Sequence, residues 1–408
     1  MTKKNILVGQ SGGPTAVINA SLYGIIKEGL CHPQEIDTIY GMIHGIEGFL
    51  QGKYMDLSHE LTKDDLELLK NTPAAYLGSC RFKLPEDLNS SFYPTIFEKF
   101  SELNIGAFFY IGGNDSMDTV SKLSRYAALH QIDIRFIGIP KTIDNDLILT
   151  DHTPGYGSAA KYVATTVREI ALDASVYQQK SVTIIELMGR HAGWLTAASV
   201  LARKDPKDNP VLIYLPEAPF SVDQFCCDLE KAFEQRSSLI VCVSEGIHDA
   251  DGRFICEYGS ESQLDTFGHK MLTGCGKVLE NIVKERLKVK VRSVELNVSQ
   301  RCSGILASQT DIEEAVMAGS YGITAALQGE TGCMVSFQRE YKDGNYHLSC
   351  NTQDVNLICN QEKPVPLFWI TNHGTDLREE FIQYASPLIQ GEPKREMEDG
   401  LPKYLYRK

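Results

Sequence analysis

The sequence predicts an α/β protein whose mostly parallel sheets are covered by helices on both faces. Short, continuously apolar runs alternate with longer segments of helical periodicity along most of the chain. Apolar runs without alternation are typical of strands buried on both faces of a parallel sheet, and their alternation with helices indicates right-handed β-α-β crossovers. The expected strands are 6–8, 107–111, 136–139, 182–187, 211–215 and 239–243, with helices at 15–30, 117–130, 158–174 and 223–234.

The C-terminal third of the sequence is less regular. Apolar runs at 333–337 and 346–350 flank the turn sequence Lys342-Asp343-Gly344-Asn345, which predicts a β-hairpin. We therefore expect antiparallel strands added to a mainly parallel architecture.

Composition and charge limit the classes of function. The chain has 408 residues and a formal net charge of −13, which disfavours sequence-independent binding of nucleic acid. No stretch approaches the roughly 20 apolar residues of a membrane-spanning helix, and the N-terminus enters a strand-like run without room for a signal peptide. The 11 cysteines lack C-x-x-C spacing, which favours free thiols in a reducing cytosol. We expect a cytoplasmic protein with no nucleic-acid or membrane partner.

Polar or glycine-rich loops follow five of the expected strands. In parallel sheets a ligand lies beyond the carboxyl ends of the strands, so these loops should converge on one cleft. The loops are Ser11-Gly12-Gly13-Pro14, Gly112-Gly113-Asn114-Asp115-Ser116, Pro140-Lys141-Thr142-Ile143-Asp144-Asn145-Asp146, Met188-Gly189-Arg190 and Ser244-Glu245-Gly246.

Two of these loops carry the clearest chemistry. Gly12-Gly13 precedes an expected helix, so its amides and the helix dipole suit an anion, although such a turn is often only a tight connection. In the 140–146 loop, Asp144 and Asp146 point the same way if the segment is extended, and could serve as base and metal ligand. The alternative is a local Asx-type turn. Lys141 would suit an anionic ligand in the same place.

Four arginines and one glutamate near these loops are further candidates. Guanidinium groups bind phosphate through two hydrogen bonds, although each of these arginines taken alone is more often part of a surface ion pair. Glu245 ends a buried strand, where its carboxylate could accept hydrogen bonds from sugar hydroxyls. The arginines are Arg81, Arg190, Arg292 and Arg301.

In this order and spacing, the motifs resemble the phosphofructokinase family. The resemblance runs from Gly12 to about Thr324 and rests on P-K-T-I-D-N-D together with the glycine loops, M-G-R and S-E-G. It implies two Rossmann-like three-layer α/β/α domains with mostly parallel sheets and the active site in the cleft between them. Residues 1–153 with about 300–355 would hold the phosphoryl donor, and residues 154–299 with about 356–408 would hold a sugar phosphate.

The resemblance also implies roles for individual residues. Asp144 would be the general base that takes the proton from the 1-hydroxyl of fructose 6-phosphate, with Asp146 near a Mg²⁺ ion. The sugar phosphate would be bound by Thr142, Met188, Gly189, Arg190, Glu245, Arg292, Val298 and Arg301. The donor would be bound by Gly12, Arg81 and Lys141.

Three positions depart from the family pattern. Ser181 stands where many members have arginine, and Val298 stands where bacterial ATP-dependent members often have histidine. Asn114 occupies the position of the usual metal-ligating aspartate. Because an amide oxygen is a weaker ligand than a carboxylate, the metal would be held through water, Asp146 and the donor's own oxygens, and Asn114 stays a candidate metal-site residue.

Two substitutions bear on the phosphoryl donor. ATP-dependent bacterial members resemble G-G-D-G-S and P-G-T-I-D-N-D, whereas here Asp115 and Lys141 replace glycines. Asp115 would place its bulk and charge where the α-phosphate and ribose of a nucleotide run. Lys141 would bind the far phosphate of pyrophosphate and offset the charge of Asp115. This is the pattern of the family's pyrophosphate-dependent branch, with Asp144, Lys141 and Asp115 as the catalytic set.

The function implied is the reversible, Mg²⁺-dependent transfer of a phosphoryl group from pyrophosphate to fructose 6-phosphate in glycolysis. A homodimer or homotetramer is expected, with Arg292 a candidate for reaching a partner subunit. Two alternatives stay open, namely an ATP-dependent phosphofructokinase and a catalytically silent paralogue that binds sugar phosphates.

Overall fold

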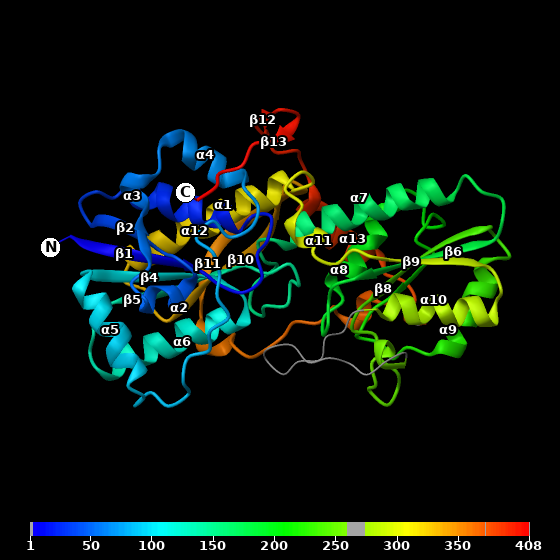
Figure 1. Cartoon of the computed structure of the whole chain (residues 1–408), viewed down its shortest axis with the longest axis horizontal. Coiled ribbons are helices and arrows are strands. Elements are labelled where there is room, and N and C mark those ends of the chain that lie inside the picture. Colours follow the sequence, from blue (N-terminus) through cyan, green and yellow to red (C-terminus); the bar gives the residue numbers. More distant parts are fainter. Residues whose placement is uncertain (1–2, 259–273, 372, 408) are drawn as a thin grey trace.

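The protein forms two lobes that lie side by side, each built on one sheet (Figure 1). The computed structural model describes residues 3–258, 274–371 and 373–407. Parallel pairing dominates both sheets, and helices cover both faces of each, so the expected α/β class with two three-layer units is confirmed. Among the described residues, no helix is both long and apolar enough to cross a membrane.

The first lobe contains a seven-stranded sheet in the order β11-β10-β5-β4-β1-β2-β3. Its strands are β1 (Lys4–Gln10), β2 (Ile36–Met42), β3 (Tyr54–Asp56), β4 (Ile105–Gly112), β5 (Arg135–Pro140), β10 (Cys333–Lys342) and β11 (Asn345–Asp354). Its helices are α1 (Ile18–Leu30), α2 (Gly45–Leu50), α3 (Leu57–Glu60), α4 (Lys63–Asn71), α5 (Phe92–Glu102), α6 (Asn114–Leu129) and α12 (Gln309–Leu327). The expected hairpin is confirmed as β10 and β11, which pair antiparallel.

Strand β4 shows why the sequences of the central strands are unbroken runs of apolar residues. Phe108 and Tyr110 belong to the core shared with α5 and α6, whereas Phe109 and Ile111 belong to the core shared with α1. Both faces are therefore buried, and removal of this apolar surface from water stabilises the three-layer arrangement.

The second lobe contains a four-stranded parallel sheet in the order β7-β8-β6-β9. Its strands are β6 (Ser181–Leu187), β7 (Leu212–Tyr214), β8 (Ser238–Ser244) and β9 (Lys290–Glu295). Helices α7 (Tyr156–Ala174), α8 (Trp194–Ala198) and α13 (Glu379–Ala385) pack on one face, and α9 (Val222–Ala232) and α10 (Cys275–Arg286) on the other. The short helix α11 (Ser299–Cys302) contacts α7.

The C-terminal part of the chain contacts both lobes. After β11 it crosses to the second lobe, where Phe381 and Leu388 join the core under α7. It then returns past a two-stranded hairpin of β12 (Met397–Glu398) and β13 (Leu401–Pro402), and Leu405 packs against the first lobe (Figure 1).

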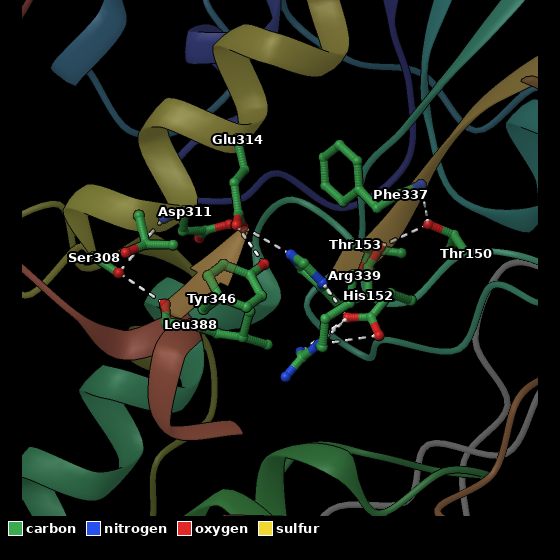
Figure 2. A network of polar contacts seen from close by, with 12 residues as sticks. Thr150, His152, Thr153, Ser308, Asp311, Glu314, Phe337, Arg339, Tyr346 and Leu388 are labelled. Atoms are coloured by element: carbon green, nitrogen blue, oxygen red, sulfur yellow. Dashed lines mark hydrogen bonds and ion pairs between the residues drawn. The ribbon is translucent and has the colours of Figure 1, made fainter. Parts of the chain in front are cut away.

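A buried polar network lies where the chain leaves the first lobe for α7 (Figure 2). The ring nitrogens of His152 lie 2.7 Å from both Asp151 Oδ1 and Glu314 Oε2, and Arg339 Nη2 donates to Asp151 Oδ1 over 2.9 Å. Asp311 of α12 accepts hydrogen bonds from the backbone amides of Gly155 and Ser158 at the start of α7. These bonds fix the junction of the lobes, and with it the end of the loop that carries Asp144.

Candidate active site

The five predicted loops do converge, and they line two adjoining cavities of about 670 Å³ and 320 Å³. The larger cavity contains the 11–15 turn, Arg81, the start of α6 and Lys141, and the smaller contains the 188–192 loop and Glu245. Four side chains line both cavities, namely Asp144, Asp146, Met188 and Glu362. The two aspartates therefore stand at the boundary between two binding spaces.

The larger cavity gathers cations around the glycine turn. Gly12 has a φ of +75°, which glycine adopts without strain. Lys141 Nζ donates to the carbonyl of Gly13 over 2.7 Å, and a Cβ added at Gly13 would lie 3.3 Å from Arg301 Nη1. Burial lowers the pKa of Lys141 to about 8, against the opposing pull of Asp144 and Asp146. An anionic ligand would stabilise the charged form of a lysine that is buried in this way.

Asn114 and Asp115 lie in the first turn of α6. The helix begins three residues before Met117, where the sequence predicted its start. Asn114 Nδ2 donates to the carbonyl of Gln361 over 2.9 Å. A carboxylate at this position would face that carbonyl with a second acceptor, which gives a physical reason for asparagine in place of the family's aspartate. The cation beside Asp115 is Lys83, 3.6 Å away, rather than the Lys141 that the sequence suggested.

The 140–146 loop, which we call the catalytic loop, is not fully extended, although the sequence analysis considered an extended segment. Asn145, between the two aspartates, is buried and has a φ of +54°. Its Oδ1 accepts from the amide of Thr153 and its Nδ2 donates to Tyr384 Oη, so side-chain bonds hold the unusual backbone in place. Both aspartates still line both cavities. Burial raises the pKa of Asp144 and that of Asp146, although Lys141 opposes the shift at Asp144.

The smaller cavity combines a cation with a carboxyl group. Gly189 has a φ of +133°, and its amide donates to Glu245 Oε1 over 3.3 Å. Burial raises the pKa of Glu245 to about 7. Arg190 Nε is buried and has no hydrogen-bond partner among the described residues. An unpaired guanidinium donor beside a carboxyl group suits a ligand that carries both phosphate and hydroxyl groups.

The structure brings most of the predicted site residues together, but not all of them. Arg301 of α11 lines the larger cavity rather than the smaller one. Val298, just before α11, has half of its surface exposed and lines neither cavity. Arg292 of β9 is exposed beside Ser181 and Thr183, away from the cleft of its own chain. Their roles in binding stay predictions.

The residues present fit a magnesium ion that keeps other ligands. Asn114 Oδ1 is buried without a partner among the described residues, and Asp146 lines the same cavity. In the parts of the chain that the structure describes, no group of three or more His, Cys, Asp or Glu side chains could hold a metal by itself. Mg²⁺ commonly binds through one or two protein oxygens together with water and substrate phosphates, so this donor set suits it.

Comparison with known proteins supports the same interpretation. The sequence profile described as Phosphofructokinase matches residues 5–326. The chain belongs to the phosphofructokinase family. It is 37% identical over 408 residues, covering 99% of this chain and 96% of the other, to the pyrophosphate–fructose 6-phosphate 1-phosphotransferase of Methylococcus capsulatus. That of Xanthomonas campestris pv. campestris is 39% identical over 409 residues, with 99% and 96% covered.

A solved phosphofructokinase shares the fold over nearly its whole length. The pyrophosphate-dependent phosphofructokinase of Nitrosospira multiformis superposes with a TM-score of 0.89 at 34% identity, covering 99% of this chain and 96% of that one. The expected family and fold are therefore confirmed.

Sequence reasoning missed the segment that closes one side of this phosphofructokinase cleft. Asn360 lines the larger cavity, and Glu362 lines both. Neither residue follows a parallel strand. The expectation that binding loops follow the carboxyl ends of parallel strands therefore did not point to them. The only hint was a charged pair, Glu362-Lys363, placed directly before a proline between the hairpin and α13.

Proposed function

We propose that the protein is a diphosphate–fructose-6-phosphate 1-phosphotransferase, which reversibly transfers a phosphoryl group from pyrophosphate to fructose 6-phosphate in glycolysis. The products are fructose 1,6-bisphosphate and phosphate. The observation that carries this proposal is the position of Asp144 on the wall shared by a cation-rich cavity and a cavity with Arg190 and Glu245. The names of the relatives with more than 95% coverage support it.

In this proposal the donor occupies the larger cavity and the sugar phosphate the smaller. Asp144 accepts the proton of the sugar's 1-hydroxyl as that oxygen bonds to phosphorus, and phosphate leaves on the opposite side. Lys141, Arg81 and Arg301 balance the charge of the transferred and leaving phosphates. Asp146 and Asn114 would hold Mg²⁺, which supplies further charge neutralisation when it is bound. Thr142, Met188, Gly189, Arg190 and Glu245 would orient the sugar phosphate.

The choice of pyrophosphate over ATP rests on Asp115 and Lys141. Asp115 lies at the start of α6 in the larger cavity with most of its side chain exposed, so its charge faces incoming donors. Lys141 is only 3% exposed and points at the glycine turn. A short inorganic donor can reach this buried cation without passing a nucleotide tail across Asp115.

A donor assay tests the proposal. Formation of fructose 1,6-bisphosphate is followed through aldolase with pyrophosphate or ATP, with and without Mg²⁺. We expect turnover with pyrophosphate, little or none with ATP, and loss of turnover when EDTA removes the metal. Turnover with ATP alone would indicate an ATP-dependent enzyme. Binding of fructose 6-phosphate without turnover from either donor would indicate a silent paralogue.

We also propose a cytoplasmic homodimer or homotetramer. Each of the 11 cysteines is a free thiol, which supports a reducing compartment. Arg292 and Lys290 are exposed on β9 away from the cleft of their own chain, where Arg292 could serve a partner's sugar phosphate. Light scattering during size-exclusion chromatography gives the assembly, and loss of fructose 6-phosphate affinity in Arg292→Ala without a change of fold tests the role of Arg292.

A further inference from the structure

One segment, residues 360–365, lines both cavities of the candidate active site and is bonded to both lobes. We call it the bridging segment. It follows β11 and its 3-10 turn and has no regular secondary structure between residues 361 and 366. It leads from the first lobe to the second (Figure 1), and two of its side chains, Asn360 and Glu362, line the cleft.

On the first lobe, the bridging segment is bonded to Asn114 at the start of α6 and to the 140–146 loop. The carbonyl of Gln361 accepts from Asn114 Nδ2 over 2.9 Å. The amide of Lys363 donates to the carbonyl of Asp146 over 2.7 Å. Lys363 Nζ donates to the carbonyls of Thr150 and Asp151 over 3.1 Å and 2.8 Å. Lys363 thus holds the catalytic loop at Asp146 and again a few residues later.

On the second lobe, the same segment is bonded at Gly193 and Trp194, directly after the 188–192 loop that carries Arg190. The carbonyl of Lys363 accepts from Trp194 Nε1 over 2.8 Å, and its ammonium lies 5.2 Å from the centre of a Trp194 ring. Glu217 Oε1 accepts from the amides of both Val365 and Gly193 over 2.8 Å each. Gly193 and Trp194 directly follow residues 188–192, which we call the sugar-side loop.

Lys363 therefore ties the 140–146 loop and the residues after it to Trp194 on the other side of the cleft. Phosphoryl transfer needs the attacking hydroxyl, the base and the donor phosphorus in line, and a displacement of about 1 Å can cost roughly 100-fold in rate. A residue that fixes the spacing between the Asp144 loop and the Arg190 loop would act on this alignment without touching either substrate.

We propose that Lys363 is a positioning residue for phosphoryl transfer, holding the catalytic loop and the sugar-side loop at the spacing that the reaction requires. This inference rests on the proposed function and deepens it. Lys363 spans the cleft through its amide, its carbonyl and its ammonium together, and replacing the side chain removes only the ammonium's bonds to the 150–151 carbonyls and its contact with Trp194.

The test compares two half-buried lysines whose ammonium groups both donate to backbone carbonyls. Lys363→Met keeps the aliphatic stem and removes the donors. Lys161→Met is the control, because Lys161 Nζ donates to the carbonyls of Ala307 and Gly391 and to the carboxylate of Glu392, and the residue lines neither cavity of the cleft. For wild type and both variants, kcat and KM are measured by the aldolase assay, fructose 6-phosphate affinity by calorimetry, and folded fraction by circular dichroism.

We expect Lys363→Met to lower kcat per folded molecule by at least tenfold, with KM and fructose 6-phosphate affinity changed by less than threefold. Lys363→Arg, which keeps donors for both carbonyls, should restore part of kcat. Lys161→Met should stay within twofold of wild-type kcat whatever its thermal stability. If Lys363→Met is not recovered folded, Lys363→Gln retains one donor and should lower kcat at least fivefold.

The outcomes separate this inference from the proposed function. Wild-type kcat retained in the Lys363 variant would overturn the positioning role alone, as would a loss matched by Lys161→Met. If wild type uses ATP rather than pyrophosphate, the donor assignment fails, and the same comparison is made with ATP. Wild type without turnover from either donor would overturn both.

Discussion

The buried network at the junction of the lobes and the cleft between them both contain charged side chains. The pKa shifts of the ion-paired His152 and Asp151 favour their charged forms, whereas those of Lys141 and Glu245 in the cleft favour their neutral forms. In the network, burial alone would lower the pKa of His152, but Glu314 and Asp151 outweigh it and raise it to about 9. Burial likewise opposes the charge of Asp151, yet His152 and Arg339 lower its pKa to about 2. In the cleft, burial prevails, lowering the pKa of Lys141 to about 8 and raising that of Glu245 to about 7.

The difference separates charges that stabilise the fold from charges that serve a ligand. Within the network, His152, Asp151, Glu314 and Arg339 each contact an opposite charge, so their burial is compensated. Asp311 contacts amides instead, and burial raises its pKa to about 6. In the cleft, burial outweighs the partners that Lys141 and Glu245 have within the chain. In the proposed function, the phosphates and the sugar would supply the further partners. Shifts of this second kind are typical of functional sites.

The largest expected effect comes from replacing the base in the cleft. Asp144→Asn should lower kcat by about 10²- to 10⁴-fold with little change in KM, because a base acts in the transition state. Since burial opposes the charge of Asp144, we expect no loss of thermal stability. Coupled-assay kinetics and thermal unfolding measure the two effects. A kcat within tenfold of wild type would remove Asp144 from this role.

The network should show the opposite behaviour, with an effect on stability alone. Its histidine has a pKa of about 9 when folded, against about 6.5 when unfolded, so between these values the native state binds more protons. The free energy of unfolding should therefore fall as the pH rises through this window, by about 3 kcal/mol for this group. Urea unfolding at successive pH values measures the slope.

Glu314→Gln is the matched variant for the network, because it keeps the shape of the side chain while removing the charge beside His152. Its pH slope should be shallower than that of wild type, and its kcat per folded molecule should be unchanged. The difference between the two proteins isolates the histidine, because buried lysines such as Lys141 contribute the opposite slope above pH 8. Identical slopes would show that the network is not linked to stability in this way.

A smaller effect should appear in the pH dependence of catalysis. Lys141 must be charged to bind pyrophosphate, and its pKa in the free enzyme is about 8. The value of kcat/KM for pyrophosphate should therefore fall roughly tenfold between pH 7 and pH 9. In Lys141→Arg, which stays charged, this decline should disappear if the variant is active. An unchanged decline would assign the titration to another group.

The comparison also shows which parts of the molecule the sequence could predict. Strand-end loops were found because continuous apolar runs such as 107–111 mark strands buried on both faces, and the ends of such strands meet at one cleft. Strand β9, by contrast, was missed, because Lys290 and Arg292 interrupt its apolar pattern.

The junction and the bridging segment were out of reach for a different reason. His152, Glu314 and Arg339 come from three distant segments, and no local pattern indicates that they meet. The amide and the carbonyl of Lys363 form two of its contacts across the cleft, and backbone groups carry no sequence signal. Asn114 was recognised as a departure from the family pattern, but its cause, the carbonyl of Gln361, lies 247 residues further along the chain.

Asp115 differs from the other charged residues of the cleft. It is mostly exposed and lies 3.6 Å from Lys83, so it is neither strongly desolvated nor without a partner. An exposed charge is screened by solvent, so its removal should have the smallest effect. We expect Asp115→Gly to raise kcat/KM for ATP relative to pyrophosphate by about threefold, which corresponds to about 0.7 kcal/mol. Asp133→Gly, outside the cleft, is the control.

A further gain in the double variant with Lys141→Gly would show that the two positions act together. If ATP stays excluded in both, the donor is selected by the shape of the cavity around Phe82 and Asn360, which line it beside these residues.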